Sequence, residues 1–212
     1  MTERRFRSFV AIGDSLSAGA EGDTAEPWPE HAARALAGDG PPLAFRNLSV
    51  AGATSTDVAI WQLQEAVALR PELVSVICGA NDVLLSVRPD PEVFTAVFDG
   101  IADSLRRRLP NAEIITATYP RLGTLLPVRP RTGARIEVGI DAINASIRAV
   151  AARRGLTCLE WSDHAGVNDP SNFADDKFHP SADGHRRAAA AFLEGLAEHL
   201  GAHVPDDAED AA

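Results

Sequence analysis

Five short apolar runs alternate with helix-like patterns along the chain, and this alternation limits the fold more than any other feature. The runs cover residues 8–14, 44–50, 73–78, 113–118 and 156–161, lengths typical of buried strands. Strands that alternate with helices form a parallel sheet that is covered on both faces. Right-handed crossovers then predict a doubly wound, five-stranded α/β fold, for which the flavodoxin-like strand order 2-1-3-4-5 is common at this chain length.

The segments between the runs predict amphipathic helices with identifiable ends. One helix begins near Pro27 and ends before Gly38, and another begins near Thr56, with Ser55 or Thr56 as its cap. Ser181 is placed to cap the last helix. The apolar stripes expected to face the core are Ile60, Leu63 and Val67; Val93, Val97, Ile101 and Leu105; Ile136, Ile140, Ile143, Ile147 and Val150; and Ala188, Phe192, Leu196 and Leu200.

Composition indicates one globular domain whose main partner is not nucleic acid. The chain has 212 residues, of which 45% are hydrophobic, and this suffices for one sizeable core. Its net charge of −10 disfavours nucleic acid or an anionic membrane surface, because both require basic patches. We expect a single domain over residues 1–204 and a disordered acidic tail over residues 205–212.

The sequence shows neither a membrane span nor a signal peptide. It has no run of about eighteen apolar residues, the minimum for a transmembrane helix. The basic stretch at residues 1–7 is followed by only about five apolar residues, fewer than the ~7–15 of a signal-peptide core, so we expect a cytoplasmic protein. Cys78 and Cys158 lie in apolar runs, which predicts buried free thiols.

Residues that carry chemistry follow several of the predicted strands. Ser15 ends the stretch Phe9-Val-Ala-Ile-Gly-Asp-Ser15, Gly52 follows the second strand and Asn81 follows the third. Asp176 and His179 come late in the loop after the fifth strand. The carboxyl ends of parallel strands meet at one edge of the sheet, where ligands bind in folds of this kind. We therefore expect these five residues to lie close together.

These residue types are the ones that acyl transfer requires. Serine is a nucleophile once a base takes its proton, and histidine is the side chain most often used as that base. Asp176, three residues before His179, can orient the imidazole. The N–H groups of Ser15 and Gly52 and the Asn81 amide are three donors for a tetrahedral oxyanion. Each residue taken singly also fits a turn, a cap or a surface loop, so the joint occurrence favours catalysis.

The same residues stand in ordered blocks that resemble the GDSL, or SGNH, hydrolases. The blocks are Gly13-Asp-Ser15, the Gly52 loop, Gly79-Ala-Asn-Asp82 and Asp176-Lys-Phe-His-Pro180, and the resemblance spans residues 8–200. It implies a three-layer α/β/α sandwich and ester or lipid hydrolysis through an acyl-enzyme intermediate, without a metal or other cofactor. By the same resemblance Ser15 is the nucleophile, His179 the base and Asp176 its partner, while Ser15, Gly52 and Asn81 form the oxyanion hole.

Substrate specificity is expected from the loop after the fourth predicted strand. Its Leu125, Leu126 and Val128 are candidates to line an acyl pocket or a lid, with packing onto their own domain as the alternative. Small acyl esters are the first expectation; a lysophospholipid, a thioester or an acetylated sugar are the others. A non-catalytic module that binds esters or glycans is the alternative from another functional class. A metal site at His185 and its neighbours is disfavoured, because His179 is needed as the base.

Overall fold

A five-stranded, all-parallel sheet in the order β2-β1-β3-β4-β5 forms the centre of the computed structural model, which describes residues 6–19, 25–121, 123, 126–164 and 166–201. Its strands are β1 (Ser8–Gly13), β2 (Ala44–Asn47), β3 (Leu73–Ile77), β4 (Glu113–Ala117) and β5 (Thr157–Leu159). The predicted doubly wound, flavodoxin-like order is confirmed. Strands β2 and β5 are shorter than the apolar runs that predicted them.

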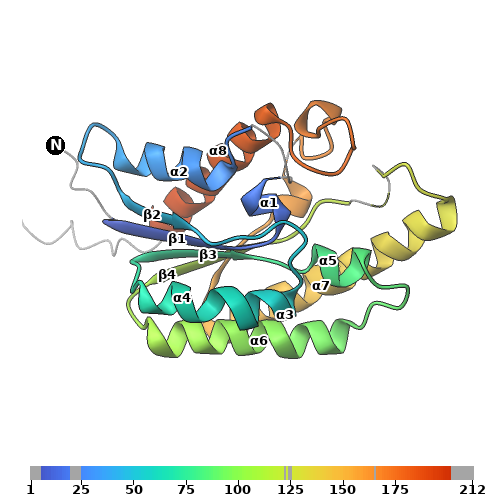
Figure 1. The fold of residues 1–212 in the computed structure, drawn as a ribbon, viewed down its shortest axis with the longest axis horizontal. Helices are drawn as coiled ribbons and strands as arrows, with labels where there is room; N and C mark the ends of the chain where they lie inside the picture. Colours follow the sequence, from blue (N-terminus) through green and yellow to red (C-terminus); the bar gives the residue numbers. More distant parts are fainter. Residues whose placement is uncertain (1–5, 20–24, 122, 124–125, 165, 202–212) are drawn as a thin grey trace, which may run out of the picture.

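Helices cover both faces of the sheet and complete three layers (Figure 1). Two helices, α2 (Trp28–Ala37) and α8 (Ala182–Gly201), pack against each other on one face. The layer on the other face contains α4 (Leu63–Ala68), α6 (Pro91–Arg108) and α7 (Pro130–Arg154). Short helices begin at the carboxyl ends of three strands or in the loops that follow them: α1 (Ser15–Ala18), α3 (Ser55–Asp57) and α5 (Ala80–Leu84).

Aromatic side chains fill the core on both sides of the sheet. Under α2 and α8, Phe9 stacks on Phe192 with ring centroids 5.7 Å apart, and Trp28 lies 4.8 Å from Phe192. In the other layer Phe94 stacks on Phe98 at 5.5 Å. All five side chains are at most 1% exposed. Burial of each such ring contributes about 1.5–3 kcal/mol, so the sheet is held from both faces.

The helix after β2 differs from the predicted one in both its start and its buried face. It begins at Ser55, and Thr54 caps it in a capping box with Asp57. A π-helical segment, η1 (Val58–Gln62), then joins α3 to α4. A π-turn adds a residue to the helical repeat and so rotates the apolar stripe. Val58 and Gln62 are therefore buried, whereas Ile60, predicted to face the core, is 57% exposed.

The long segment after β5 contains two short 3₁₀ helices, η2 (Trp161–Asp163) and η3 (Pro170–Asn172). Ser181 caps α8 as predicted, because its hydroxyl accepts the N–H of Gly184 at 3.0 Å. Cys78 is a buried free thiol and Cys158 a half-buried one. The predicted tail at residues 205–212 lies outside the described residues. Among the described helices, none has the length and apolar character that a membrane crossing requires.

Candidate active site

Ser15 stands at the carboxyl end of β1, where it is the first residue of α1 and is 4% exposed. Gly13, two residues earlier, has φ of +152°, and a Cβ there would lie 2.0 Å from the carbonyl oxygen of Ile77. Only glycine fits this close approach of β1 to β3. The Gln62 side chain holds the same residue: its Oε1 accepts the Gly13 N–H at 2.7 Å, and its Nε2 donates to the Gly13 carbonyl at 2.9 Å. The backbone before Ser15 is thus fixed from two sides.

Asp14 is a buried carboxyl group that holds α1 in place. One carboxylate oxygen accepts the N–H of Leu16 at 3.0 Å, and the other accepts the Tyr119 hydroxyl at 2.9 Å. Asp14 therefore bonds a backbone amide of the short helix that it precedes. Burial raises the pKa of Asp14 from 3.8 to about 6, although the bonds from Leu16 and Tyr119 partly oppose this shift.

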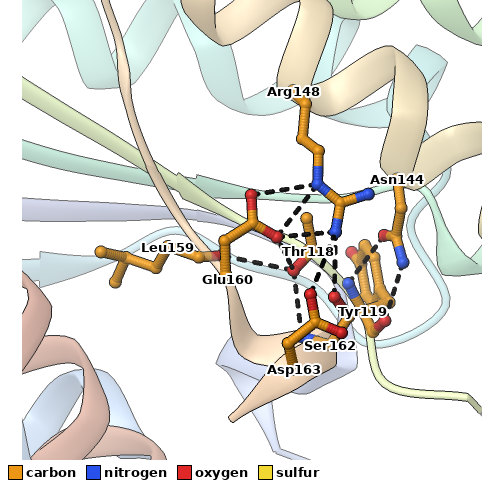
Figure 2. Close-up of polar contacts among 8 residues, drawn as sticks. All are labelled: Thr118, Tyr119, Asn144, Arg148, Leu159, Glu160, Ser162 and Asp163. Atoms are coloured by element: carbon orange, nitrogen blue, oxygen red, sulfur yellow. Dashed lines mark hydrogen bonds and ion pairs between the residues drawn. The ribbon is translucent and has the colours of Figure 1, made fainter.

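Tyr119 follows β4 and is itself held by a side chain of α7. The Asn144 amide bonds its backbone twice: Oδ1 accepts the Tyr119 N–H at 2.8 Å, and Nδ2 donates to the Tyr119 carbonyl at 2.9 Å (Figure 2). Because the Tyr119 hydroxyl reaches Asp14, this pair of bonds connects α7 to the residue before the candidate nucleophile.

A second group of polar contacts on α7 anchors the segment that follows β5 (Figure 2). The Arg148 guanidinium donates to the Glu160 carboxylate at 2.6 Å and to the Ser162 hydroxyl at 3.0 Å. The N–H of Ser162 in turn donates to the Thr118 hydroxyl at 3.0 Å. These bonds fix η2 against the carboxyl end of β4.

His179 and Asp176 form a close contact near the carboxyl edge of the sheet. His179 Nδ1 lies 2.6 Å from Asp176 Oδ2, and the other oxygen of Asp176 accepts the N–H groups of Phe178 and His179 at 2.9 and 3.0 Å. Partial burial opposes ionisation of Asp176, but these hydrogen bonds together outweigh it and hold the pKa of its carboxyl below the ordinary value. The arrangement leaves Nε2 of His179 as the ring nitrogen directed away from Asp176.

Asn81 is the second residue of α5, and hydrogen bonds tie this helix to the loop after β2 that contains Gly52. Asn81 is 6% exposed and its Nδ2 donates to the carbonyl of Ala53 at 3.0 Å. The Asp82 carboxylate accepts both the N–H and the hydroxyl of Ser55, at 2.9 and 2.6 Å. Gly52 has φ of +81°, and a Cβ there would meet no described atom within 4 Å, so its peptide is uncovered on that side. One amide hydrogen of Asn81 bonds the Ala53 carbonyl and so fixes the loop that contains Gly52. The second amide hydrogen is left to donate to a substrate oxygen.

Ser15 and His179 line one small cavity of about 40 Å³. Asp14, Tyr119 and Phe178 are also in its wall. The volume has room for only a few water molecules. The structure therefore brings the predicted nucleophile and the predicted base together. Asn81 and Gly52 are not in this wall, although Ala80, the residue before Asn81, is.

Comparison with known proteins agrees with this geometry. The model of the GDSL-like lipase/acylhydrolase family matches residues 11–187, which is most of the chain and includes the five candidate residues. The chain belongs to this family.

Solved structures with the same fold include several GDSL-family proteins. TesA is 23% identical, with 89% of this chain and 97% of TesA covered at a TM-score of 0.71. The lipase/acylhydrolase from Enterococcus faecalis is 20% identical, with 91% and 96% covered at a TM-score of 0.72. A catalytic mutant of Axe2, an acetylxylan esterase from Geobacillus stearothermophilus, is 19% identical, with 90% and 94% covered at a TM-score of 0.69. Among curated proteins, none matches the sequence.

Two of the loop residues predicted to meet the substrate of this GDSL-family chain, Leu126 and Val128, do not line the cavity of Ser15 and His179. Leu126 packs against the hydrophobic core and Val128 is 40% exposed. Leu125 lies outside the described residues. The start of this loop, Tyr119 and Pro120, does line the cavity, but neither Leu126 nor Val128 does, so the described residues do not support these two side chains as an acyl pocket.

The helix after His179 holds a second histidine in a structural position. His185 is fully buried, and its Nδ1 accepts the backbone N–H of Trp28 at 3.2 Å. This bond joins α8 to the start of α2. The described part of the chain contains no group of three or more His, Cys, Asp or Glu side chains that could hold a metal ion.

Three residues that support the site were missed in the sequence. Tyr119 directly follows a predicted strand, the rule that selected Ser15 and Asn81, so the same rule would have found it. Gln62 and Asn144 gave no such signal, because each lies inside a helical pattern and acts on the backbone of a distant residue.

Proposed function

We propose that this chain is a serine esterase that cleaves carboxylic esters through an acyl-enzyme intermediate. The observation that carries the proposal is the His179–Asp176 contact of 2.6 Å together with the cavity that His179 shares with Ser15. Membership of the GDSL-like family supports ester hydrolysis in general. The acyl-enzyme route and the roles of the individual residues belong to the proposal.

The first half of the reaction forms the acyl-enzyme. His179 Nε2 takes the proton of the Ser15 hydroxyl as Oγ attacks the ester carbonyl carbon. Asp176 holds the Nδ1–H and stabilises the imidazolium that results. The carbonyl oxygen becomes an oxyanion and accepts hydrogen bonds from the N–H groups of Ser15 and Gly52 and from the Asn81 amide. The alkoxide then leaves and takes the proton from His179 Nε2.

The second half of the reaction repeats these steps with water. His179 removes a proton from a water molecule, which attacks the acyl carbon and forms a second tetrahedral intermediate. Its collapse breaks the bond to Ser15 Oγ, and the serine oxygen recovers its proton from His179. The products are a carboxylic acid and an alcohol. Hydrogen bonds within the loops keep these groups in place, so little reorganisation is needed at each step.

The experiment that tests the proposal is hydrolysis of p-nitrophenyl acetate and butyrate by the wild type, Ser15→Ala and His179→Ala. We expect each substitution to lower kcat by at least about 10³-fold, because nucleophile and base act as one unit. Ser17→Ala is the matched control: Ser17 is a buried serine of the same short helix whose hydroxyl has no partner among the described residues. Its activity should stay near that of the wild type.

A fluorophosphonate probe separates catalysis from simple binding. An activated serine forms a covalent adduct with the probe, so the wild type should be labelled and Ser15→Ala should not. A folded wild type without ester turnover and without labelling would contradict the esterase and favour a non-catalytic binding module. Labelling that persists in Ser15→Ala would place the nucleophile elsewhere.

A further inference from the structure

A second, larger cavity of about 310 Å³ adjoins the one that holds Ser15 and His179. It lies between α8 and the segment that contains η2 and η3. Four residues line both cavities: Leu16, Pro120, Phe173 and Pro180. The two cavities are therefore adjacent, and one of the shared residues, Leu16, directly follows the candidate nucleophile.

The surface of the larger cavity is mostly apolar. Besides the shared wall, it is formed by Trp161, Val167, Ala188 and Ala191. Trp161 is 7% exposed and packs edge-on against Trp28, with ring centroids 5.6 Å apart. The bonds of Arg148 to Glu160 and Ser162 fix the backbone on either side of Trp161 (Figure 2). This wall of the larger cavity is thus preformed before a ligand binds.

Polar side chains at the edge of this cavity are bonded to one another. The Arg187 guanidinium donates to the Ser171 hydroxyl and to the side-chain Oδ1 of Asn172, at 2.8 and 2.5 Å. The Asn172 amide nitrogen donates to the carbonyls of Gly166 and Val167, at 2.8 and 3.2 Å. These bonds stiffen the rim and pair Arg187 and Asn172 with neighbouring groups. His164, Asp169 and Glu194 also line the cavity, but most of its surface is apolar, so the lining favours an apolar ligand.

We propose that this cavity binds an unbranched apolar chain of the ester substrate, either on its acyl side or on its alcohol side. The inference rests on the proposed esterase function, because the chain must remain attached to the carbonyl that Ser15 attacks. An apolar cavity of about 150 Å³ holds one benzene molecule, so a volume of about 310 Å³ has room for at most about twelve carbon atoms. The substrate class is therefore an ester with a medium-length chain.

Two ester series test the proposal and identify the side on which the chain lies. One varies the acyl group of p-nitrophenyl esters from acetyl to decanoyl, and the other varies the alcohol of acetate esters from ethyl to decyl. In the series that uses the cavity, kcat/KM should rise by up to about fourfold for each methylene buried, until the space is filled.

Ala188→Phe places a ring inside the cavity, because Ala188 is a half-buried residue of α8 in its wall. We expect the ratio of the eight-carbon to the two-carbon kcat/KM to fall by at least about tenfold, since displacing two methylenes already costs that much. Ala197→Phe is the matched control, because Ala197 is exposed on the same helix and does not line this cavity. Ala191→Leu is a second filling variant if Ala188→Phe does not fold.

Each outcome decides the proposal. If one ester series shows a preference for longer chains and the filling variants remove it, the result supports binding of the chain in this cavity. The series that shows the preference then identifies whether the chain lies on the acyl or the alcohol side. Serine-dependent turnover with no length preference, or with a preference that both filling variants retain, overturns the inference and leaves the esterase intact. Absence of any Ser15-dependent turnover refutes the proposed function itself.

Discussion

Replacement of Asp14 by asparagine should make the protein more stable at neutral pH. The Asp14 carboxyl is 1% exposed and its pKa is raised from 3.8 to about 6, chiefly by burial. A difference of one pKa unit corresponds to about 1.36 kcal/mol, so ionised Asp14 costs the folded state about 3 kcal/mol above pH 6. Asparagine is neutral, yet its Oδ1 can still accept the Leu16 N–H and its Nδ2 can donate to the Tyr119 hydroxyl oxygen.

The sign of the effect follows from the raised pKa. The folded state binds the Asp14 proton more tightly than the unfolded state, so this group favours folding below pH 3.8. That contribution is lost as the pH rises through about 6. The advantage of Asp14→Asn should therefore be near zero at pH 4 and reach its full value by pH 7.

Urea denaturation of the wild type and Asp14→Asn at pH 4, 5, 6, 7 and 8 measures this difference directly. Asp90→Asn is the matched control, because Asp90 is an exposed cap of α6 and asparagine caps a helix as well as aspartate does. Asp90→Asn should change stability little at any of these pH values. An Asp14→Asn variant equally or less stable than the wild type at pH 8 would refute burial as the dominant effect on this carboxyl group.

Two further substitutions test the support of the site. Gln62→Leu should lower the free energy of unfolding by roughly 1–3 kcal/mol in urea denaturation, because it leaves the N–H of Gly13 buried and unpaired, whereas the Gly13 carbonyl still accepts the N–H of Val50; a loss below about 0.5 kcal/mol would contradict this. Asn81→Ala should lower kcat for p-nitrophenyl acetate by about 10²–10³-fold, because it removes one donor to the oxyanion. An unchanged kcat would exclude Asn81 from that role.

The sheet and the location of the site were predictable because both follow from local patterns. Each strand of a parallel sheet is buried on both faces, so it appears in the sequence as a short continuous apolar run. Ser15 and His179 could be assigned to one edge because every strand runs in the same direction, and the structure does bring them to one cavity.

The helix between β2 and β3 shows why periodicity alone fails inside some elements. The predicted stripe assumed a uniform α-helical repeat, whereas the π-helical segment Val58–Gln62 changes the phase. The reason for the change is visible only in three dimensions: it buries Gln62, whose amide satisfies both backbone groups of Gly13. A polar residue inside a helical pattern gives no sign of a partner 49 positions away.

The candidate nucleophile, Ser15, is therefore positioned mainly by residues that no short motif contains. Gln62 holds Gly13, the carbonyl of Ile77 accepts the N–H of Asp14 at 3.1 Å, and Tyr119 reaches the Asp14 side chain. These supports come from η1, β3 and the end of β4, and they meet because parallel strands present their carboxyl ends together. A Gly-Asp-Ser tripeptide on another scaffold would lack all three bonds. This explains physically why the tripeptide alone is weak evidence for an esterase, whereas its occurrence with the Gly52, Asn81 and His179 blocks in a parallel fold is strong evidence.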